Sequence, residues 1–221
     1  MPDRLTGDIT LDGAVVITGA LSLDTPSITN AMIISTAAIT RSRLAQDTVQ
    51  AYVVPFTACR VWDDLAALVP GTAATDDLGI IEGTFGTDAP TVQTSDAKAT
   101  TVTQRLRFLF QLPPEYDSAQ TLECRIRGGM ITTVSDTTAT VDVECYEADG
   151  DGAVGADLSA TAATTLNSLT KANVDFTVTA TSLVAGDWLD VRVTVAITDA
   201  ATATAVIGEI SQIVMRLDIK G

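Results

Sequence analysis

The chain has 221 residues, of which 46% are apolar and only 5% aromatic, and its formal net charge is -15. A surface this acidic repels phosphate backbones, so we expect no nucleic-acid partner. Histidine is absent, which removes the commonest general base and metal ligand and excludes Ser-His-Asp and Cys-His catalytic arrangements. Abundant threonine and valine favour an all-β chain.

Residues 1–30 read as a stem of very short apolar/polar alternations, each ended by glycine, aspartate or asparagine. Strands this short do not make a self-sufficient sheet, so neighbouring rungs or identical chains must supply the missing pairing. A connector follows up to residue 50, either as a short helix or as further rungs. We therefore predict that residues 1–50 serve in oligomerisation or docking, through Ile9, Leu11, Val15, Ile17, Leu21, Leu23 and Ile28.

Residues 51–221 are predicted to form the body, an eight-stranded jelly-roll β-sandwich. Eight apolar or alternating runs with loops of uneven length suit two packed sheets better than an up-and-down barrel. Asp63–Val69 is the best candidate for a short helix. The predicted strands are Tyr52–Trp62, Leu78–Ile81, Val102–Leu112, Thr121–Thr133, Thr138–Glu147, Val174–Thr179, Trp188–Thr198 and Ala205–Ile219.

A hairpin is predicted between the fourth and fifth of these strands, with a tight turn at Ser135-Asp136. In this register both strands agree on which face is buried. The opposing residues are Ile126 and Cys145, Met130 and Val141, Arg127 and Glu144, and Gly129 and Asp142.

The three cysteines, Cys59, Cys124 and Cys145, are odd in number, lack a CxxC spacing and lie in apolar runs. Buried, reduced thiols are expected, as in a protein that folds in a reducing cytoplasm. The N-terminus is polar and no apolar run approaches membrane-spanning length. We therefore expect no signal peptide, no transmembrane segment and no membrane partner.

Paired carboxylates are the remaining catalytic possibility, since a glycosidase needs two acids flanking its substrate. Such enzymes usually present aromatic platforms, whereas Trp62 and Trp188 lie in strand-like runs and are expected to pack in the core. We therefore expect a protein that is not an enzyme and binds no cofactor. The acids near predicted loops are Asp63, Asp64, Asp76, Asp77 and Glu115.

The segment Glu147–Gly152 resembles the front half of a calcium-binding loop. The full loop needs a bidentate acid at its twelfth position, which here is Leu158. A Gly/Asp-rich excursion between strands explains the segment without a metal, and an adventitious cation is the alternative.

Four arginines alternate with apolar residues and so occupy outward positions of two predicted strands. Salt-bridged outer faces or a subunit seam are expected there rather than a nucleic-acid site. The arginines are Arg105, Arg107, Arg125 and Arg127, and the acids available nearby are Glu123, Asp142 and Glu144.

Stem and body together resemble the structural proteins of tailed bacteriophages. The stem text GDITLDGAVVITGALSLDTPSITNA is similar to the Gly-punctuated short-strand segments of trimeric phage fibres and spikes. The body resembles the jelly-roll heads of capsid decoration (cement) proteins and fibre tips. The segments that carry this resemblance are Leu112–Tyr116, the TLECRIRGGM strand and the DTTATVDVECYEADGDG run. The resemblance implies a homotrimer whose stem grips the capsid or winds three chains together.

The leading hypothesis is a decoration protein on the outer head surface of the virion, made in the host cytoplasm. It would bind the major capsid protein, bridge capsomers and stabilise the shell. The alternative is a short head or tail fibre with a receptor-binding jelly roll, although 221 residues leave little room for a long shaft. A lectin-like carbohydrate-binding domain is the third possibility, disfavoured by the low aromatic content.

Overall fold

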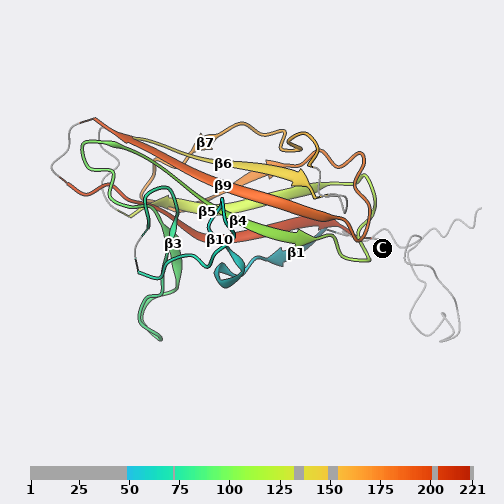
Figure 1. Ribbon diagram of the computed structural model, residues 1–221, viewed down its shortest axis with the longest axis horizontal. Helices are drawn as coiled ribbons and strands as arrows, with labels where there is room; N and C mark the ends of the chain where they lie inside the picture. The colour runs from blue at the N-terminus through green and yellow to red at the C-terminus, as the bar shows by residue number, and fades with distance from the viewer. Residues whose placement is uncertain (1–48, 72, 132–136, 149–153, 201–203, 220–221) are drawn as a thin grey trace, which may run out of the picture. The chain divides into compact units, whose positions relative to one another are not determined.

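The computed structural model describes residues 49–219, except 72, 132–136, 149–153 and 201–203. The described chain forms ten β-strands in two antiparallel sheets (Figure 1). Sheet A contains β2 (Gly79–Ile81), β3 (Thr91–Gln93), β10 (Gly208–Asp218), β5 (Leu122–Met130) and β8 (Ala172–Thr177), and β1 (Val49–Val53) also pairs with β10. Sheet B contains β4 (Thr101–Gln111), β9 (Trp188–Asp199), β6 (Thr137–Glu147) and β7 (Thr164–Thr165).

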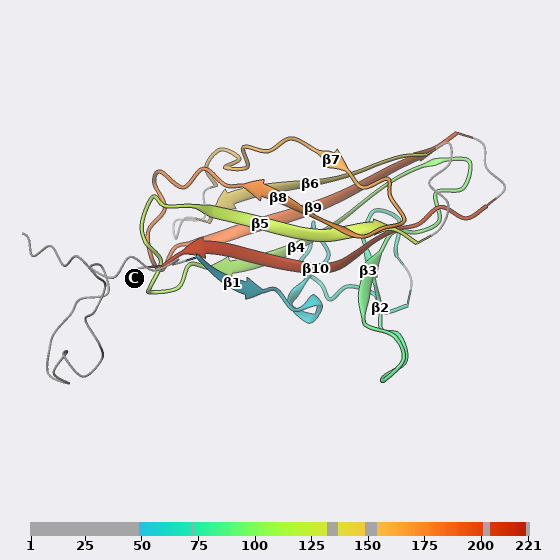
Figure 2. The ribbon, with the colours of Figure 1, turned by 180° about the vertical axis from the view of Figure 1, so that it is seen from behind.

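The strand order is that of a jelly roll, which confirms the predicted fold class. Strands near the two ends of the described sequence pair with each other, and the pairing continues towards the middle of the sequence. The pairs are β1 with β10, β4 with β9, β5 with β8 and β6 with β7. Pairing of β5 with β10 and of β6 with β9 then joins these four ribbons into two sheets. The remaining strands, β2 and β3, form a hairpin inserted between β1 and β4 (Figure 2).

The core lies between the sheets and follows from strict alternation along the long strands. In β9 every second residue from Leu189 to Ile197 is fully buried, while the residues between them face outward. Phe176 of β8 and Ile213 of β10 are buried opposite them in sheet A. A sheet with one face in the core and one face outward requires every second side chain to be buried. The apolar residues of the sequence alternate in the same way, so they coincide with the buried face.

The predicted first strand is interrupted, because β1 ends at Val53 and Pro55 leads into a 3-10 turn at Phe56–Ala58. The short helix predicted at Asp63–Val69 is wrong. Its residue Leu65 has a positive φ of 61°, which a right-handed helix excludes, and the Asp64 carboxylate accepts the backbone N–H of Ala66 at 2.8 Å to form a turn.

The predicted hairpin between residues 121 and 147 is also wrong. Its two strands, β5 and β6, lie in different sheets, and the predicted turn lies outside the described residues. Ile126 pairs with Ile213, and Cys145 pairs with Val191. Both strands do bury the predicted face, because alternation identifies the buried face of a strand and not its neighbour.

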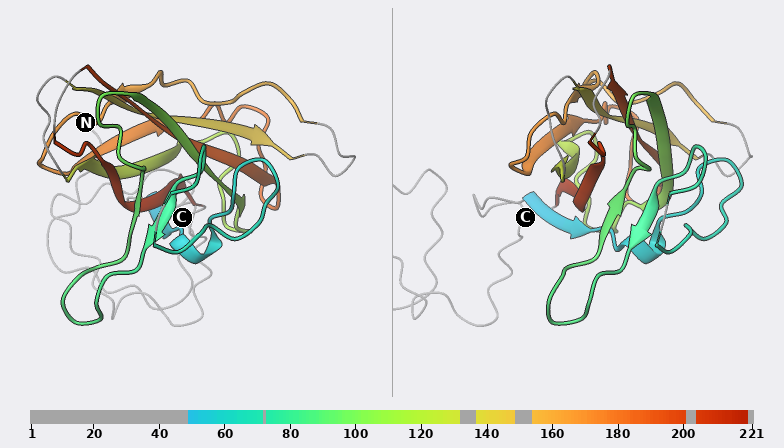
Figure 3. Two further views of the ribbon diagram at one scale, coloured as in Figure 1. Left: turned by 60° about the vertical axis from the view of Figure 1, so that its left-hand side comes forward. Right: turned by 90° about the vertical axis from the view of Figure 1, so that its left-hand side faces the viewer.

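The inserted hairpin is tied to the sandwich by the wholly buried Gln104 of β4. Its side-chain oxygen accepts the backbone N–H of Ser95 at 2.6 Å, and its amide nitrogen donates to the carbonyl of Ala74. One side chain therefore holds both arms of the insertion, and the loop between β2 and β3 extends away from the two sheets (Figure 3).

All three cysteines are free and buried, as predicted. Burial raises the pKa of Cys59 and of Cys145 to about 12, and it also raises the pKa of Cys124. Within the described residues, no helix is long and apolar enough to cross a membrane.

Candidate functional site

The outer face of sheet B gathers a cluster of aromatic and charged side chains, which we call the Trp62 cluster. The register places Arg107 of β4, Arg192 of β9 and Glu144 of β6 in one row across the sheet. The next row holds Leu109, Asp190 and Tyr146. Trp62 and the facing residues Arg107, Tyr146, Asp190 and Arg192 line a shallow cavity of about 190 Å³.

Trp62 reaches this face because the loop after β1 pairs with the edge of sheet B, through two backbone bonds between Arg60 and Arg107. The guanidinium carbons of Arg105 and Arg192 lie 5.0 Å and 5.3 Å from the centre of the indole ring. Both distances fit cation–π contacts. The indole N–H donates to Asp76 at 3.0 Å, so the polar edge of the ring is also held.

The arginines of the cluster are paired with acids. Arg107 donates to Asp190 through Nε at 2.6 Å and also through Nη2, and this hydrogen bonding raises the pKa of the guanidinium. Arg192 donates from Nε to Glu144 at 2.6 Å. Fork-shaped pairing of this kind fixes the orientation of the guanidinium planes.

The core-packing prediction for the two tryptophans is wrong. Trp62 is half-buried on the outer face, and Trp188, at the first position of β9, is 46% exposed. Strand-like context misled the prediction because Trp62 lies in a loop and Trp188 begins its strand on the outward side.

The predicted carboxylates are partly brought together. Asp63 and Asp64 lie close enough to Asp77 for their charges to contribute to a raised pKa of that carboxyl. The pKa of Asp77 is raised, first by partial burial and then by the neighbouring Asp76 charge. Glu115 lies elsewhere, on the connection between β4 and β5. The described part of the chain holds no group of three acids or cysteines arranged to bind a metal ion.

The four arginines do not form one patch, because two lie on sheet B and two on sheet A. Ion pairing is confirmed for Arg107 and for Arg125, although their partners are Asp190 and Asp175 rather than the predicted acids. Arg105 contacts Trp62 instead.

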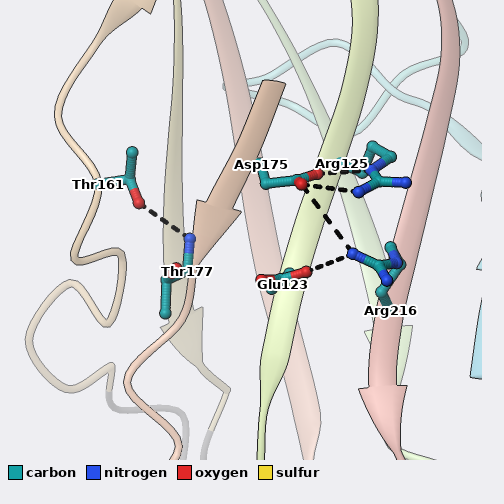
Figure 4. A network of polar contacts seen from close by, with 6 residues as sticks. All are labelled: Glu123, Arg125, Thr161, Asp175, Thr177 and Arg216. Atoms are coloured by element: carbon teal, nitrogen blue, oxygen red, sulfur yellow. Dashed lines mark hydrogen bonds and ion pairs between the residues drawn. The ribbon is translucent and has the colours of Figure 1, made fainter. Parts of the chain in front are cut away.

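The outer face of sheet A carries its own charge network (Figure 4). Arg125 contacts Asp175 at 2.5 Å and 2.7 Å, and Arg216 donates to Glu123 at 2.6 Å while lying 4.0 Å from Asp175. Hydrogen bonding by Arg125 lowers the pKa of Asp175. Two positive and two negative charges thus neutralise each other on this face.

The insertion offers a second surface, an apolar groove of about 470 Å³ beside the loop that follows β1. The sequence pattern predicted neither this groove nor the tip of the hairpin, where Phe85 is 104% exposed. The available signal was the position of Phe85, two residues after Gly83 and directly before Gly86. Glycines at these positions indicate a turn, and an aromatic ring in a turn at the end of a hairpin is left exposed.

Two predicted features lie outside the described residues. These are the stem positions Ile9, Leu11, Val15, Ile17, Leu21, Leu23 and Ile28, and most of the calcium-like segment, of which residues 149–152 are not described.

No protein-family model and no curated protein matches the sequence. Among solved structures, the chain is similar to the CBM22-1 xylan-binding domain of Paenibacillus barcinonensis Xyn10C, with 10% identity over 77% of this chain and 97% of that chain and a TM-score of 0.36. It is similar to the mannan-recognising module TmCBM27, with 12% identity over 76% and 98% of the two chains and a TM-score of 0.36. A chain of infectious bursal disease virus Gt strain is 14% identical over 78% of this chain and 32% of that chain, with a TM-score of 0.39.

The class of the protein rests on its own strand order, and it is a jelly-roll β-sandwich.

Proposed function

We propose that the protein is a structural component of a tailed-phage virion, a decoration protein that binds the outer head surface as a homotrimer and bridges capsomers. The observation that carries the proposal is the inserted hairpin, which extends from the sandwich and presents the fully exposed Phe85. Aromatic residues, Phe included, are enriched at protein–protein contacts, so an exposed Phe85 at the end of a projecting hairpin supports a contact role.

The paired charges of the sandwich fit the same role. The four-charge network of sheet A and the ion pairs of the Trp62 cluster hold their side chains in place, so both outer faces are preorganised surfaces. Excess negative charge, -15 over the chain, favours solubility of a protein displayed in many copies.

Copy number tests this proposal. Densitometry of purified virions should give a number of copies comparable to that of the major capsid protein, in the hundreds per particle. A number in the tens would favour the fibre alternative and refute decoration.

In a second test, chains lacking residues 1–30 should fail to bind undecorated capsids while keeping the circular dichroism of the sandwich. Unchanged capsid affinity would refute the docking role of the stem.

Glycan binding is the second candidate, supported by exposed side chains at one end of sheet B. Trp188 and Leu109, 46% and 48% exposed, occupy neighbouring outward positions beside Tyr146. An exposed indole gives a sugar ring an apolar stacking face. Trp188→Ala should then abolish any signal on a glycan array. The control is Leu169→Ala, which changes an exposed apolar residue on the connection between β7 and β8 and should leave the signal unchanged. No binding by the wild-type chain would refute this candidate.

A further inference from the structure

Both tryptophans of the chain lie on the outer face of sheet B. Trp62 is one wall of the cavity in the Trp62 cluster, and Trp188 begins β9 on the same face. The cavity also contains Tyr146 and Asp190, which stand opposite each other on β6 and β9. Asp190 is the next outward residue after Trp188, so one ligand lying along β9 can contact all three aromatic rings.

The polar groups of the cavity are held in place by their own ion pairs. Arg107 donates two hydrogen bonds to Asp190, and Arg192 donates to Glu144 at 2.6 Å. These four side chains keep between 13% and 31% of their surface exposed, so solvent reaches them. Donors and acceptors therefore lie side by side on a rigid surface, and binding to them costs little side-chain entropy. A sugar hydroxyl both donates and accepts a hydrogen bond, which matches such an arrangement.

The charges around the cavity favour a neutral ligand. Its two arginines are matched by Asp190 in the wall and by Glu144 beside it. Arg105 and Asp76, which both contact the indole of the cluster, add one charge of each sign. An anion would be repelled by the acids around Asp77 and by the net charge of -15, whereas a cation would face two guanidinium groups.

The cavity is small and lies apart from the exposed Trp188. Its volume of about 190 Å³ is below the roughly 300–1,000 Å³ of pockets that hold drug-sized ligands, so it takes one ring rather than a chain of sugars. Along β9, Trp188 lies four residues from Arg192, which is about 13 Å at the spacing of a β-strand. A ligand that contacts both must therefore be extended and have several rings.

We infer that the outer face of sheet B binds a neutral oligosaccharide along β9, with one sugar ring in the cavity of the Trp62 cluster and another stacked on Trp188. The exposed indole of Trp188 supplies the apolar stacking face, and Asp190 and Arg192 supply hydrogen bonds to the hydroxyls. The inference rests on the glycan-binding candidate and names its ligand class and its second contact. It does not depend on the decoration role.

Tryptophan fluorescence tests whether the ligand enters the cavity. Because the chain has two tryptophans, Trp188→Phe leaves Trp62 as the only reporter while keeping an aromatic stacking face, and Trp62→Phe leaves Trp188. The full-length variants would be mixed with neutral gluco-, manno-, galacto- or xylo-configured hexasaccharides, and with hexagalacturonate as the anionic probe. At least one neutral hexasaccharide should protect both tryptophans from quenching by acrylamide, and hexagalacturonate should protect neither.

The pattern of protection separates the cavity from the wider glycan candidate. Protection of Trp188 without protection of Trp62 would overturn the inference and leave glycan binding at Trp188 standing. Equal protection by hexagalacturonate would refute the neutral ligand class. Protection of neither tryptophan by any hexasaccharide would remove the glycan candidate together with the cavity site, while the copy number on virions would still decide decoration.

Calorimetric titration with the protecting hexasaccharide provides the second test. Asp190→Asn keeps the size of the side chain but removes the charged acceptor, so it should weaken binding at least about tenfold. The wild type should bind the hexasaccharide at least about tenfold more tightly than the corresponding monosaccharide, and Trp188→Ala should remove that difference. Leu169→Ala should change neither affinity. Unchanged affinity of Asp190→Asn, or equal affinity of the wild type for monosaccharide and hexasaccharide, would refute the extended site.

Discussion

The three buried thiols should make the protein sensitive to alkaline pH. Burial favours the neutral thiol, and it raises the pKa of Cys59 and Cys145 from 9.0 to about 12 and that of Cys124 in the same direction. Below pH 9 both the folded and the unfolded chain hold these protons, so the stability is fully present. As the pH rises from 9 towards 12, only the unfolded chain releases them, and stability is lost.

The size of the effect follows from the width of that window. Between pH 8 and pH 10, each thiol lowers the free energy of unfolding by about 1.4 kcal/mol, so the three together lower it by about 4 kcal/mol. Other groups also titrate in this range, including Tyr116, whose pKa is raised by burial. The prediction therefore concerns the difference between the wild type and a variant without thiols.

Urea unfolding at pH 8, 9 and 10, with a phosphine reductant present, measures this difference. The control is the triple variant Cys59→Ala, Cys124→Ala, Cys145→Ala, which is less stable throughout because of the small cavities that it creates. Its stability should fall less steeply with pH than that of the wild type. Parallel pH profiles for the two proteins would refute the reasoning, because the thiols would then ionise equally in the folded and unfolded chains.

Three further predictions concern the sandwich. Gln104→Ala should lower the free energy of unfolding by about 2–3 kcal/mol, because it leaves two backbone groups of the insertion unsatisfied; equal urea midpoints for variant and wild type would contradict this. Gly128→Ala should cost about 1–3 kcal/mol, since its Cβ would lie 2.9 Å from a backbone carbonyl of β10, whereas Gly155→Ala, with nothing within 4 Å, should be neutral in the same assay. The pKa of Asp175 is lowered by Arg125, so its ionised form stabilises the fold above about pH 4 and less as the pH falls further. The stability difference between wild type and Asp175→Asn should thus shrink in acid, and a constant difference down to pH 2 would count against the ion pair.

The long strands were predictable because their alternation is physically enforced. A residue such as Val193, buried between two sheets, cannot exchange places with its outward neighbour Arg192 without exposing the core, so the pattern is written in the sequence. Strands β3 and β7 have three and two residues, too few for any alternation to show, and both were missed.

The neighbour of each strand could not be predicted in the same way. β5 was paired with β6 because they are adjacent along the chain, yet the chain crosses between sheets there and the partners come from β8, β9 and β10. The Trp62 cluster was missed for the same reason, since Trp62 and Arg192 meet only after the jelly roll has closed.

The position of β10 has a consequence for biosynthesis. It is the last of the strands to be translated, yet it lies inside sheet A, bonded to β5 on one edge and to β1 and β3 on the other. A ribosome-bound chain that stops before Gly208 therefore lacks the strand on which three others depend. Because most contacts join distant parts of the chain, folding should be slow and largely post-translational. Nascent chains would leave the ribosome with unpaired strand edges, which promote aggregation until β10 is in place.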